Sequence, residues 1–193
     1  MLATDTDSPY LAAGQYKSIR GNAGKSKVTI GRYKKNLGNK SHIGLIATNR
    51  DYHLGGSGSL IEFDSLINFL DDYILDLNYA RSDTQEGHVN FIDSDETFAG
   101  RTYAMDGESF SGTAKNFRLR RAVDESNWGI RFKDVSPTYR AHVGFVGRND
   151  YKVVTIGMEE LIGIKEHSEK LIFVGIIETG LTIEIKRRKS FMN

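Results

Sequence analysis

The chain contains no cysteine and only two prolines in 193 residues. The absence of cysteine excludes disulfide frameworks, thiolate zinc sites and cysteine nucleophiles. The net charge is only +1, which argues against a nucleic-acid partner, because such proteins neutralise many phosphates with basic side chains. Long apolar runs are also absent. The longest, residues 171–177, is far shorter than the ~20 residues of a membrane helix.

The N-terminus lacks the basic and then apolar segments of a secretory signal. Glycine, in contrast, is abundant at 20 residues, which indicates many turns. Between these turns, apolar and polar residues alternate, as in antiparallel strands with one apolar and one polar face. Four such segments are residues 26–35 (with an irregularity at Gly31), 116–121, 127–135 and 181–188.

Residues 58–82 fit two structures. As two strands, Ile61 to Phe69 and Tyr73 to Tyr79 would each place apolar residues on one face, with a turn at Asp71. As a helix, residues 66–77 would carry an apolar stripe. The several aspartates favour the hairpin, because aspartate is a poor helix-interior residue.

Two other segments are less regular. Residues 83–112 are rich in acidic residues, glycine, serine and threonine, which predicts a long loop with a small extra hairpin. Residues 157–170 predict a further loop or a short helix.

No motif predicts catalysis or a bound cofactor. The segment GNAGKSK at residues 21–27 ends like a phosphate-binding loop, but Ile19 replaces the first glycine and a strand-like sequence follows. The loop DSDETF offers carboxylates at Asp93, Asp95 and Glu96, yet Phe98 occupies the position where a calcium loop needs glycine. A solvated loop is therefore expected there.

The histidines are scattered, with no pair at the three- or four-residue spacing of a zinc site. They are His42, His53, His88, His142 and His167. The sequence thus predicts no catalytic residue, no cofactor and no metal ligand, and hence a protein that is not an enzyme.

The alternating strands fit two architectures. In a soluble β-sandwich the apolar face points to a core, whereas in an outer-membrane barrel it meets lipid and the polar face lines the lumen. Tyr73 and Tyr79 could lie at two membrane interfaces. An expected strand of six residues covers only roughly 15 Å, short of a ~25 Å apolar band.

Residues 127–152, NWGIRFKDVSPTYRAHVGFVGRNDYK, resemble a signature of an uncharacterised family of bacterial outer-membrane β-barrel domains. The resemblance covers about residues 41–157, including a second block at residues 41–64 and the segments ARSDTQ and SGTAKNFRLRR. In this family the domain commonly follows a module related to family-nine carbohydrate-binding modules. The matching residues are Trp128, Asp134, Ser136, Pro137, Tyr139, Arg140, Ala141, Gly144, Phe145 and Val146, with Gly44, Thr48, Arg50, Gly55, Gly56 and Asp64 in the second block.

The resemblance implies an all-β fold of antiparallel up-and-down strands, a partial outer-membrane β-barrel, with residues 1–193 as a single β domain. It also implies the outer membrane of a Gram-negative bacterium, with lipid, the remaining barrel strands or a carbohydrate-binding module as partners. Family members are much longer, so the chain is expected to be a segment of a larger barrel. Its role would be structural or transport-associated and linked to carbohydrate handling. The alternative is a soluble β-sandwich that binds a ligand or carbohydrate, with Trp128 or the tyrosines as stacking surfaces.

Pro137 cannot donate to a central ladder and is expected at a strand end. Residues 134–137 would then close the Trp128 strand, and residues 141–148 would begin the returning strand. Tyr139 and Phe145 are expected in an interfacial aromatic belt, and Arg140 and Arg148 at polar ends or in the lumen.

Overall fold

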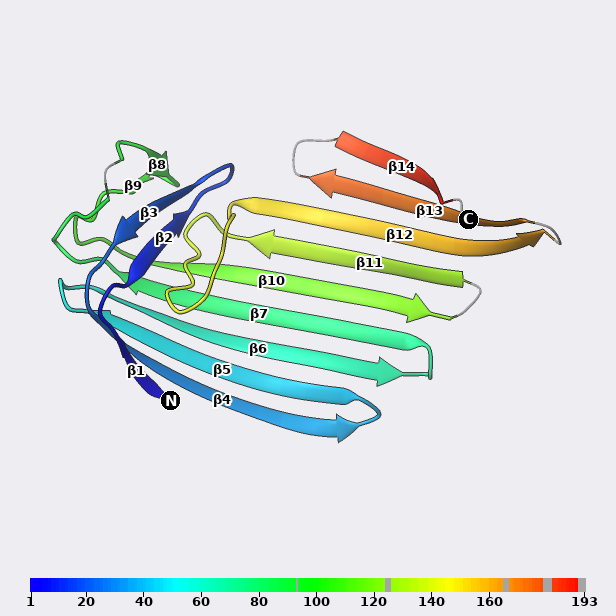
Figure 1. The fold of residues 1–193 in the computed structure, drawn as a ribbon, viewed down its shortest axis with the longest axis horizontal. Coiled ribbons are helices and arrows are strands. Elements are labelled where there is room, and N and C mark those ends of the chain that lie inside the picture. Colours follow the sequence, from blue (N-terminus) through cyan, green and yellow to red (C-terminus); the bar gives the residue numbers. More distant parts are fainter. Residues whose placement is uncertain (93, 124–125, 165–166, 179–181, 191–193) are drawn as a thin grey trace.

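A computed structural model describes the backbone of residues 1–92, 94–123, 126–164, 167–178 and 182–190, and the side chains of these residues from 1 to 157 except that of residue 126. The chain forms one ten-stranded antiparallel sheet and two small two-stranded sheets (Figure 1). The ten strands follow one another in chain order across the sheet, so the predicted all-β, antiparallel up-and-down fold is confirmed.

Most strands of the large sheet are 10–14 residues long. In spatial order they are β1 (Leu2–Asp5), β4 (Ser26–Gly38), β5 (Ser41–Tyr52), β6 (Ser57–Phe69), β7 (Tyr73–Gln85), β10 (Ser109–Ala122), β11 (Ser126–Val135), β12 (Tyr151–Ile164), β13 (His167–Glu178) and β14 (Thr182–Ser190). The sheet is open, because its edge strands β1 and β14 do not pair with each other. β6 alone, with 13 residues, spans roughly 44 Å at ~3.4 Å per residue.

The hairpin interpretation of residues 58–82 is confirmed. β6 ends at Phe69 and β7 begins at Tyr73. Leu70 and Asp71 both have positive φ, at 46° and 59°, as a tight turn between twisted antiparallel strands requires. The helical alternative is wrong, since tertiary pairing on both sides holds this segment in extended strands.

Two further expectations are wrong. Residues 157–170 do not form a loop or a helix over most of their length, because β12 continues to Ile164 and β13 begins at His167. The returning strand also begins later than expected. Residues 136–150 form a loop, and β12 begins only at Tyr151. The strand expected at 181–188 corresponds to β14, but its side chains lie outside the described residues.

Three segments leave the sheet and pack against one of its faces. They are the hairpin of β2 (Pro9–Ala13) and β3 (Ser18–Asn22), the loop 86–108 with β8 (Thr97–Phe98) and β9 (Arg101–Thr102), and the loop 136–150. Together they form what we call the inner lobe, which lies over one end of the sheet (Figure 1). The predicted long loop with a small hairpin is thus confirmed for residues 86–108, but residues 83–85 and 109–112, which were expected in the loop, belong to β7 and β10.

The buried core lies between the inner lobe and the sheet. One cluster consists of Tyr10, Ala12, Ala23, Tyr52, Ile92, Phe98, Tyr103, Met105 and Phe110. A second consists of Leu60, Ala80, Val135 and Tyr139. We call the sheet face under the lobe the inner face and the opposite one the outer face.

Candidate functional site: an apolar outer face and a polar inner face

Neighbouring rows of residues across the sheet differ sharply in polarity. One row on the outer face is purely aliphatic, and the row beside it, which points inward, carries three charges. The outer row is Ile67, Leu75, Leu119, Ile130 and Ile156, and the inner row is Leu66, Asp76, Arg118, Arg131 and Thr155. Since strand side chains alternate between faces, the two faces of the sheet differ in polarity.

The apolar character extends over much of the outer face. Strand register adds further rows to it, and we call the whole set the apolar band. Its other members are Tyr33, Ile43, Leu45, Ile61, Phe63, Phe69, Tyr73, Leu77, Tyr79, Phe117, Trp128, Phe132 and Val154. Several are largely exposed, among them Ile61 at 59% and Ile156 at 52%. Soluble monomers rarely expose contiguous apolar patches of this extent.

Aromatic rings gather at one end of the apolar band. Phe69 stacks on Tyr73 with ring centroids 5.4 Å apart, and Tyr73 meets the edge of Trp128 at 6.2 Å. At the other end, Tyr33, Phe63 and Tyr79 lie in one row with Leu45. The next row on β6 and β7 pairs Ile61 with Arg81, and in the row after it the outer face is polar, with Ser59 beside Asp83. The band therefore has two edges, each marked by aromatic side chains.

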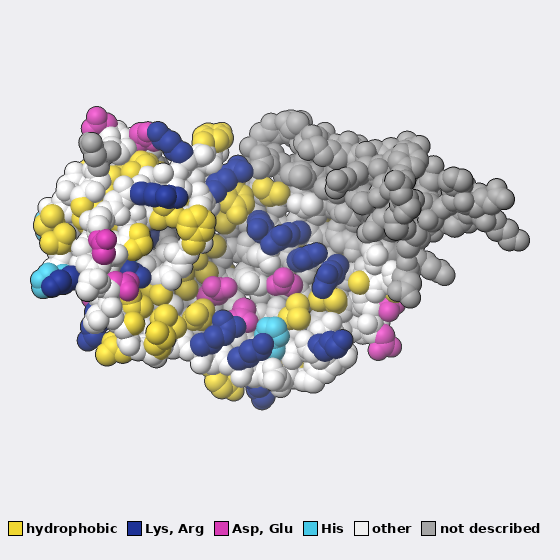
Figure 2. Space-filling model, viewed as in Figure 1, with side chains coloured by type: hydrophobic (Ala, Val, Ile, Leu, Met, Phe, Trp, Pro, Cys, Tyr) yellow, Lys and Arg dark blue, Asp and Glu magenta, His cyan; other side chains and the backbone are white. Residues whose placement is uncertain are grey.

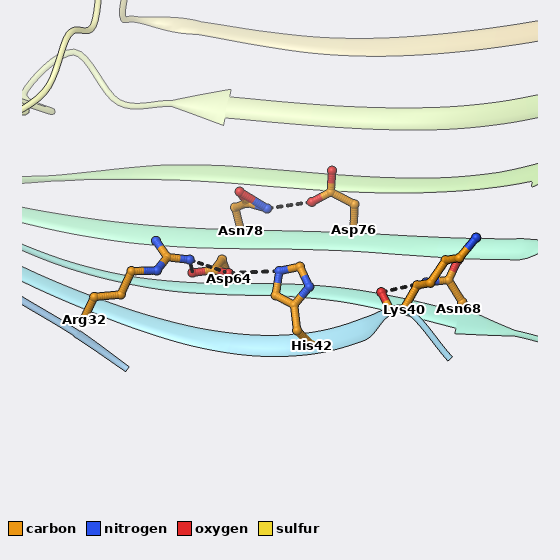
Figure 3. Close-up of polar contacts among 7 residues, drawn as sticks. All are labelled: Arg32, Lys40, His42, Asp64, Asn68, Asp76 and Asn78. Carbon is orange, nitrogen blue, oxygen red and sulfur yellow. Dashed lines mark hydrogen bonds and ion pairs between the residues drawn. The ribbon is translucent and has the colours of Figure 1, made fainter. Parts of the chain in front are cut away.

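The inner face carries a network of charged and amide side chains (Figure 3). Arg32 donates to Asp64 at 3.0 Å, and His42 Nε2 lies 3.5 Å from the same carboxylate. Asn78 donates to Asp76 at 2.6 Å. Figure 2, which views this face, shows basic, acidic and histidine side chains together over the middle of the sheet. The side chains that alternate onto the inner face are thus largely polar or charged.

Charge on the inner face is arranged in two strips. Glu62, Asp64 and Asp76 lie on β6 and β7, whereas the next two strands along the sheet, β10 and β11, carry a basic strip. The basic strip consists of Arg118, Arg120, Arg131 and Lys133. The three arginines line a hollow of about 550 Å³, and Lys133 lines an adjoining hollow of about 310 Å³. Acidic and basic strips side by side create an electric field along the inner face.

Arg140 holds the inner lobe together. Its side chain is 2% exposed and donates to the carbonyl oxygens of Pro137 and Tyr139 at 3.0 Å. The guanidinium lies 4.4 Å from the ring centre of Phe98 and is also near the rings of Tyr103 and Phe110. Such an aromatic cage stabilises a desolvated cation. Arg140 therefore joins the loop 136–150 to the loop 86–108.

His142 attaches the same loop to the sheet. Its Nδ1 lies 3.0 Å from the Tyr52 hydroxyl and its Nε2 lies 2.9 Å from the Thr84 hydroxyl. Burial, reinforced by the positive charges of Arg140 and Arg50, lowers the pKa of His142 to about 3. The imidazole is thus neutral in the folded protein, with one nitrogen donating and the other accepting.

Acidification is expected to loosen the loop 136–150. Once released, His142 regains a pKa near 6.5, so the released state binds more protons between pH 6.5 and 3 and gains stability as pH falls. At pH 4.5, two units below 6.5, the free energy that keeps the loop attached should fall by roughly 2–3 kcal/mol, because each pH unit contributes about 1.4 kcal/mol. Amide hydrogen exchange of residues 138–146 at pH 7 and 4.5 measures it. In His142→Gln, which keeps both hydrogen-bonding capacities and does not titrate, this part of the pH dependence should vanish. An equal pH dependence in both proteins contradicts the assignment.

Glycine lets the loop 136–150 approach the sheet closely. A Cβ at Gly112 of β10 would lie 2.3 Å from the backbone nitrogen of Tyr139, and one at Gly58 of β6 would lie 1.9 Å from the His142 ring. No side chain fits either position without displacing the loop. The bare backbone at these two sites is thus part of the contact between lobe and sheet.

Three carboxylates meet where β7 and β10 separate. Oxygens of Glu86, Asp106 and Glu108 lie within 4.8 Å of one another. Burial first, and then the neighbouring acids, raise the pKa of Glu86 to about 7. No spacing in the sequence predicts this cluster, because the long loop separates Glu86 from Asp106 and only the pairing of Gln85 with Ser109 brings them together.

The motif residues fall into three groups. Ser136, Pro137, Tyr139, Arg140, Gly144, Phe145 and Val146 all belong to the loop 136–150. Gly44, Thr48, Arg50 and Asp64 lie on β5 and β6, where Gly44 backs the Asp64 carboxylate and Arg50 pairs with Asp5 at 3.0 Å. Trp128 and Asp134 lie on β11, with Asp134 3.6 Å from Lys115 on the outer face.

Several expectations for single residues are corrected. Tyr139 is not in an interfacial belt, since it is 6% exposed in the second core cluster. Phe145 is 78% exposed but lies beside Arg140 and His142 at a pocket of the inner lobe. Pro137 does lie just after a strand end, as predicted. Tyr139 and Phe145 were misplaced for one reason: the loop 136–150 folds over the inner face instead of beginning a strand.

The cation loop considered for residues 93–98 is only partly described. Asp93 lies outside the described residues, and Glu96 forms an ion pair with Lys17. The segment 21–27 leads directly into β4, as its strand-like continuation predicted.

Among the described residues, no helix has the length and hydropathy needed to cross a membrane. Comparisons with models of protein families, with curated proteins and with solved structures found no match.

Proposed function

We propose that this chain is a non-catalytic segment of an outer-membrane β-barrel, with its outer face toward lipid and its inner face toward a polar lumen. Its role is structural or transport-associated. The observation that carries the proposal is the pair of neighbouring rows through Ile67 and Leu66, one aliphatic and one charged. Lipid-facing and lumen-facing residues alternate in this way along barrel strands.

The location of the core favours lipid over a sandwich interior. In a soluble sandwich the apolar face of a sheet is buried against a second sheet. Here both buried clusters lie on the inner face, while Ile61, Phe63 and Ile156 on the outer face are 42–59% exposed. A hydrocarbon environment accounts for an apolar face that no described part of the chain covers.

The length of the apolar band also fits a bilayer. On β6 the outward positions from Ile61 to Phe69 span nine residues and are apolar except for the buried Ser65, which matches the ~9–11 residues of a tilted membrane strand. The sequence-based objection that strands of six residues are too short does not apply to strands of 10–14 residues. Aromatic rings at both edges suit the two membrane interfaces.

The open edges call for partner strands. β1 pairs with β4 over Ser26–Thr29 and Met1 bonds to Ile30, so the rest of the β4 edge offers unpaired backbone groups to a further strand. An exposed edge of this length recruits another strand or aggregates. In the proposed barrel, further strands pair with the edges, and the inner lobe lies within the lumen near one mouth, where it narrows the path for solutes. The link to carbohydrate handling is supported only by the family resemblance.

Refolding of the purified chain into detergent and then into vesicles of brominated lipid tests the proposal. Trp128, the single tryptophan, belongs to the apolar band and is expected to be strongly quenched by bromine in the acyl chains. Folded samples are expected to show heat-modifiable electrophoretic mobility. A monodisperse, folded monomer in water without detergent, with Trp128 unquenched by such vesicles, contradicts the proposal.

A further inference from the structure

The carboxylates of Glu86, Asp106 and Glu108 are held at the root of the loop 86–108 by backbone pairing. Glu86 directly follows β7, and Asp106 to Glu108 directly precede β10. The Glu86 amide donates to the Glu108 carbonyl oxygen at 2.9 Å. The Gln85 side-chain amide donates to the Gly107 carbonyl oxygen at 3.0 Å. The two ends of the loop are therefore fixed relative to each other.

Glu86 provides a second and independent observation. Its side chain is buried, with 4% exposure, and its Oε2 has no hydrogen-bond partner among the described residues. A buried carboxylate oxygen without a donor is costly, because it has lost its hydration without replacement. The Glu86 carboxylate is one of the three whose oxygens meet in this cluster.

Among the described residues, Arg101 is the only basic side chain that forms an ion pair with this cluster, 3.0 Å from Glu108. Arg101 also lies over the Phe110 ring, at 5.3 Å. Three carboxylates facing one guanidinium leave excess negative charge beside a buried oxygen. Thr102 supplies a hydroxyl that donates to Asp106 at 3.3 Å, which orients that carboxylate without balancing its charge.

We propose that Glu86, Asp106 and Glu108 form a calcium site that ties the loop 86–108 to the sheet. The ligand oxygens lie within 4.8 Å of one another, and two oxygens on opposite sides of Ca²⁺ are about 4.8 Å apart, because each Ca–O distance is about 2.4 Å. Ca²⁺ takes oxygen ligands only and tolerates irregular geometry. Carbonyl oxygens and water complete its coordination. Mg²⁺ fits less well, since it requires shorter bonds in a near-octahedral arrangement.

Terbium luminescence and calorimetric Ca²⁺ titration on the whole chain, folded in detergent, test the site. Tb³⁺ is expected to bind one site, to be excited through nearby tyrosine, and to be displaced by Ca²⁺ far more readily than by Mg²⁺. The Ca²⁺ dissociation constant should fall between about 1 µM and 1 mM. Glu86→Gln, which keeps the side-chain shape, should weaken binding at least about tenfold. Asp95→Asn, which changes an exposed carboxylate in the same loop, is the matched control and should bind as the wild type does.

Arg101→Gln separates a metal site from a plain ion-pair cluster. If Arg101 competes with Ca²⁺ for Glu108, its removal should strengthen Ca²⁺ binding several-fold and make the thermal midpoint more dependent on Ca²⁺. If the acids serve only as counterions for Arg101, the variant should lose stability and Ca²⁺ should not restore it. Either that result, or equal Ca²⁺ affinities for the wild type and Glu86→Gln, overturns the proposal. Absence of saturable binding does so as well.

Discussion

Replacing Leu77 by arginine is expected to destabilise the chain folded in a bilayer by about 2–4 kcal/mol, the cost of a cationic side chain near the midplane on the lipid face of a barrel. Leu77 lies in the apolar band, in one row with Phe117 and Phe132. The arginine would have to enter hydrocarbon or bend toward an interface. Chemical unfolding from lipid vesicles, followed by tryptophan fluorescence, measures the loss.

The matched control is the same substitution one residue later. Asn78 lies on the inner face, where it donates to Asp76 and is paired in register with Asp64. A new guanidinium there gains acidic neighbours, so Asn78→Arg is expected to cost less than about 1 kcal/mol, as other polar changes in a lumen do. Equal losses for the two variants would show that the two faces meet the same solvent, contrary to the account.

Arg140→Ala has the second largest expected effect. The change empties an aromatic cage, leaves three carbonyl oxygens with fewer donors, and opens a cavity between two loops. Losing these interactions should cost the inner lobe about 2–4 kcal/mol. Tryptic cleavage after Arg148, the site in the loop 136–150 that the variant keeps, should then become roughly 30- to 800-fold faster under native conditions, since about 1.4 kcal/mol is a factor of ten.

Two further variants identify what Arg140 contributes. Arg140→Met fills most of the space and contacts the rings through its sulfur, so it should recover part of the loss without the charge. Arg20→Ala, at an exposed arginine of β3, should change the cleavage rate by less than about twofold, as for an ordinary surface position. If Arg140→Ala cleaves at the wild-type rate, Arg140 does not hold the lobe.

The alternation of side chains made the main sheet predictable from the sequence. Phe117 with Leu119, and Trp128 with Ile130 and Phe132, share a face as their spacing of two predicted. The hairpin at Phe69 and Tyr73 was favoured for a physical reason, the poor helix propensity of its aspartates. Alternation shows only that the two faces differ in polarity, however. The same pattern is expected when the apolar face lies in a sandwich core and when it faces lipid.

The inner lobe could not be predicted, because long-range contacts decide it. Residues 141–148 contain enough apolar residues to suggest a strand, yet Asn149, 1% exposed, donates to the carbonyl oxygen of Pro137 at 2.7 Å and closes the segment into a loop. Arg140 is buried by rings from a segment about forty residues away. Glu86 and Glu108 meet only because β7 pairs with β10.

The central claim is that the outer face meets lipid and the inner face meets water. A nitroxide scan of β7 tests it most directly, and the absence of cysteine from the chain allows single cysteines to be labelled without background. Labels are placed in turn at Leu75, Asp76, Leu77 and Asn78 in vesicles. Labels at 75 and 77 are expected to collide mainly with oxygen, which concentrates in lipid, and labels at 76 and 78 mainly with a water-soluble nickel complex. Equal access of the nickel complex to all four positions would contradict it.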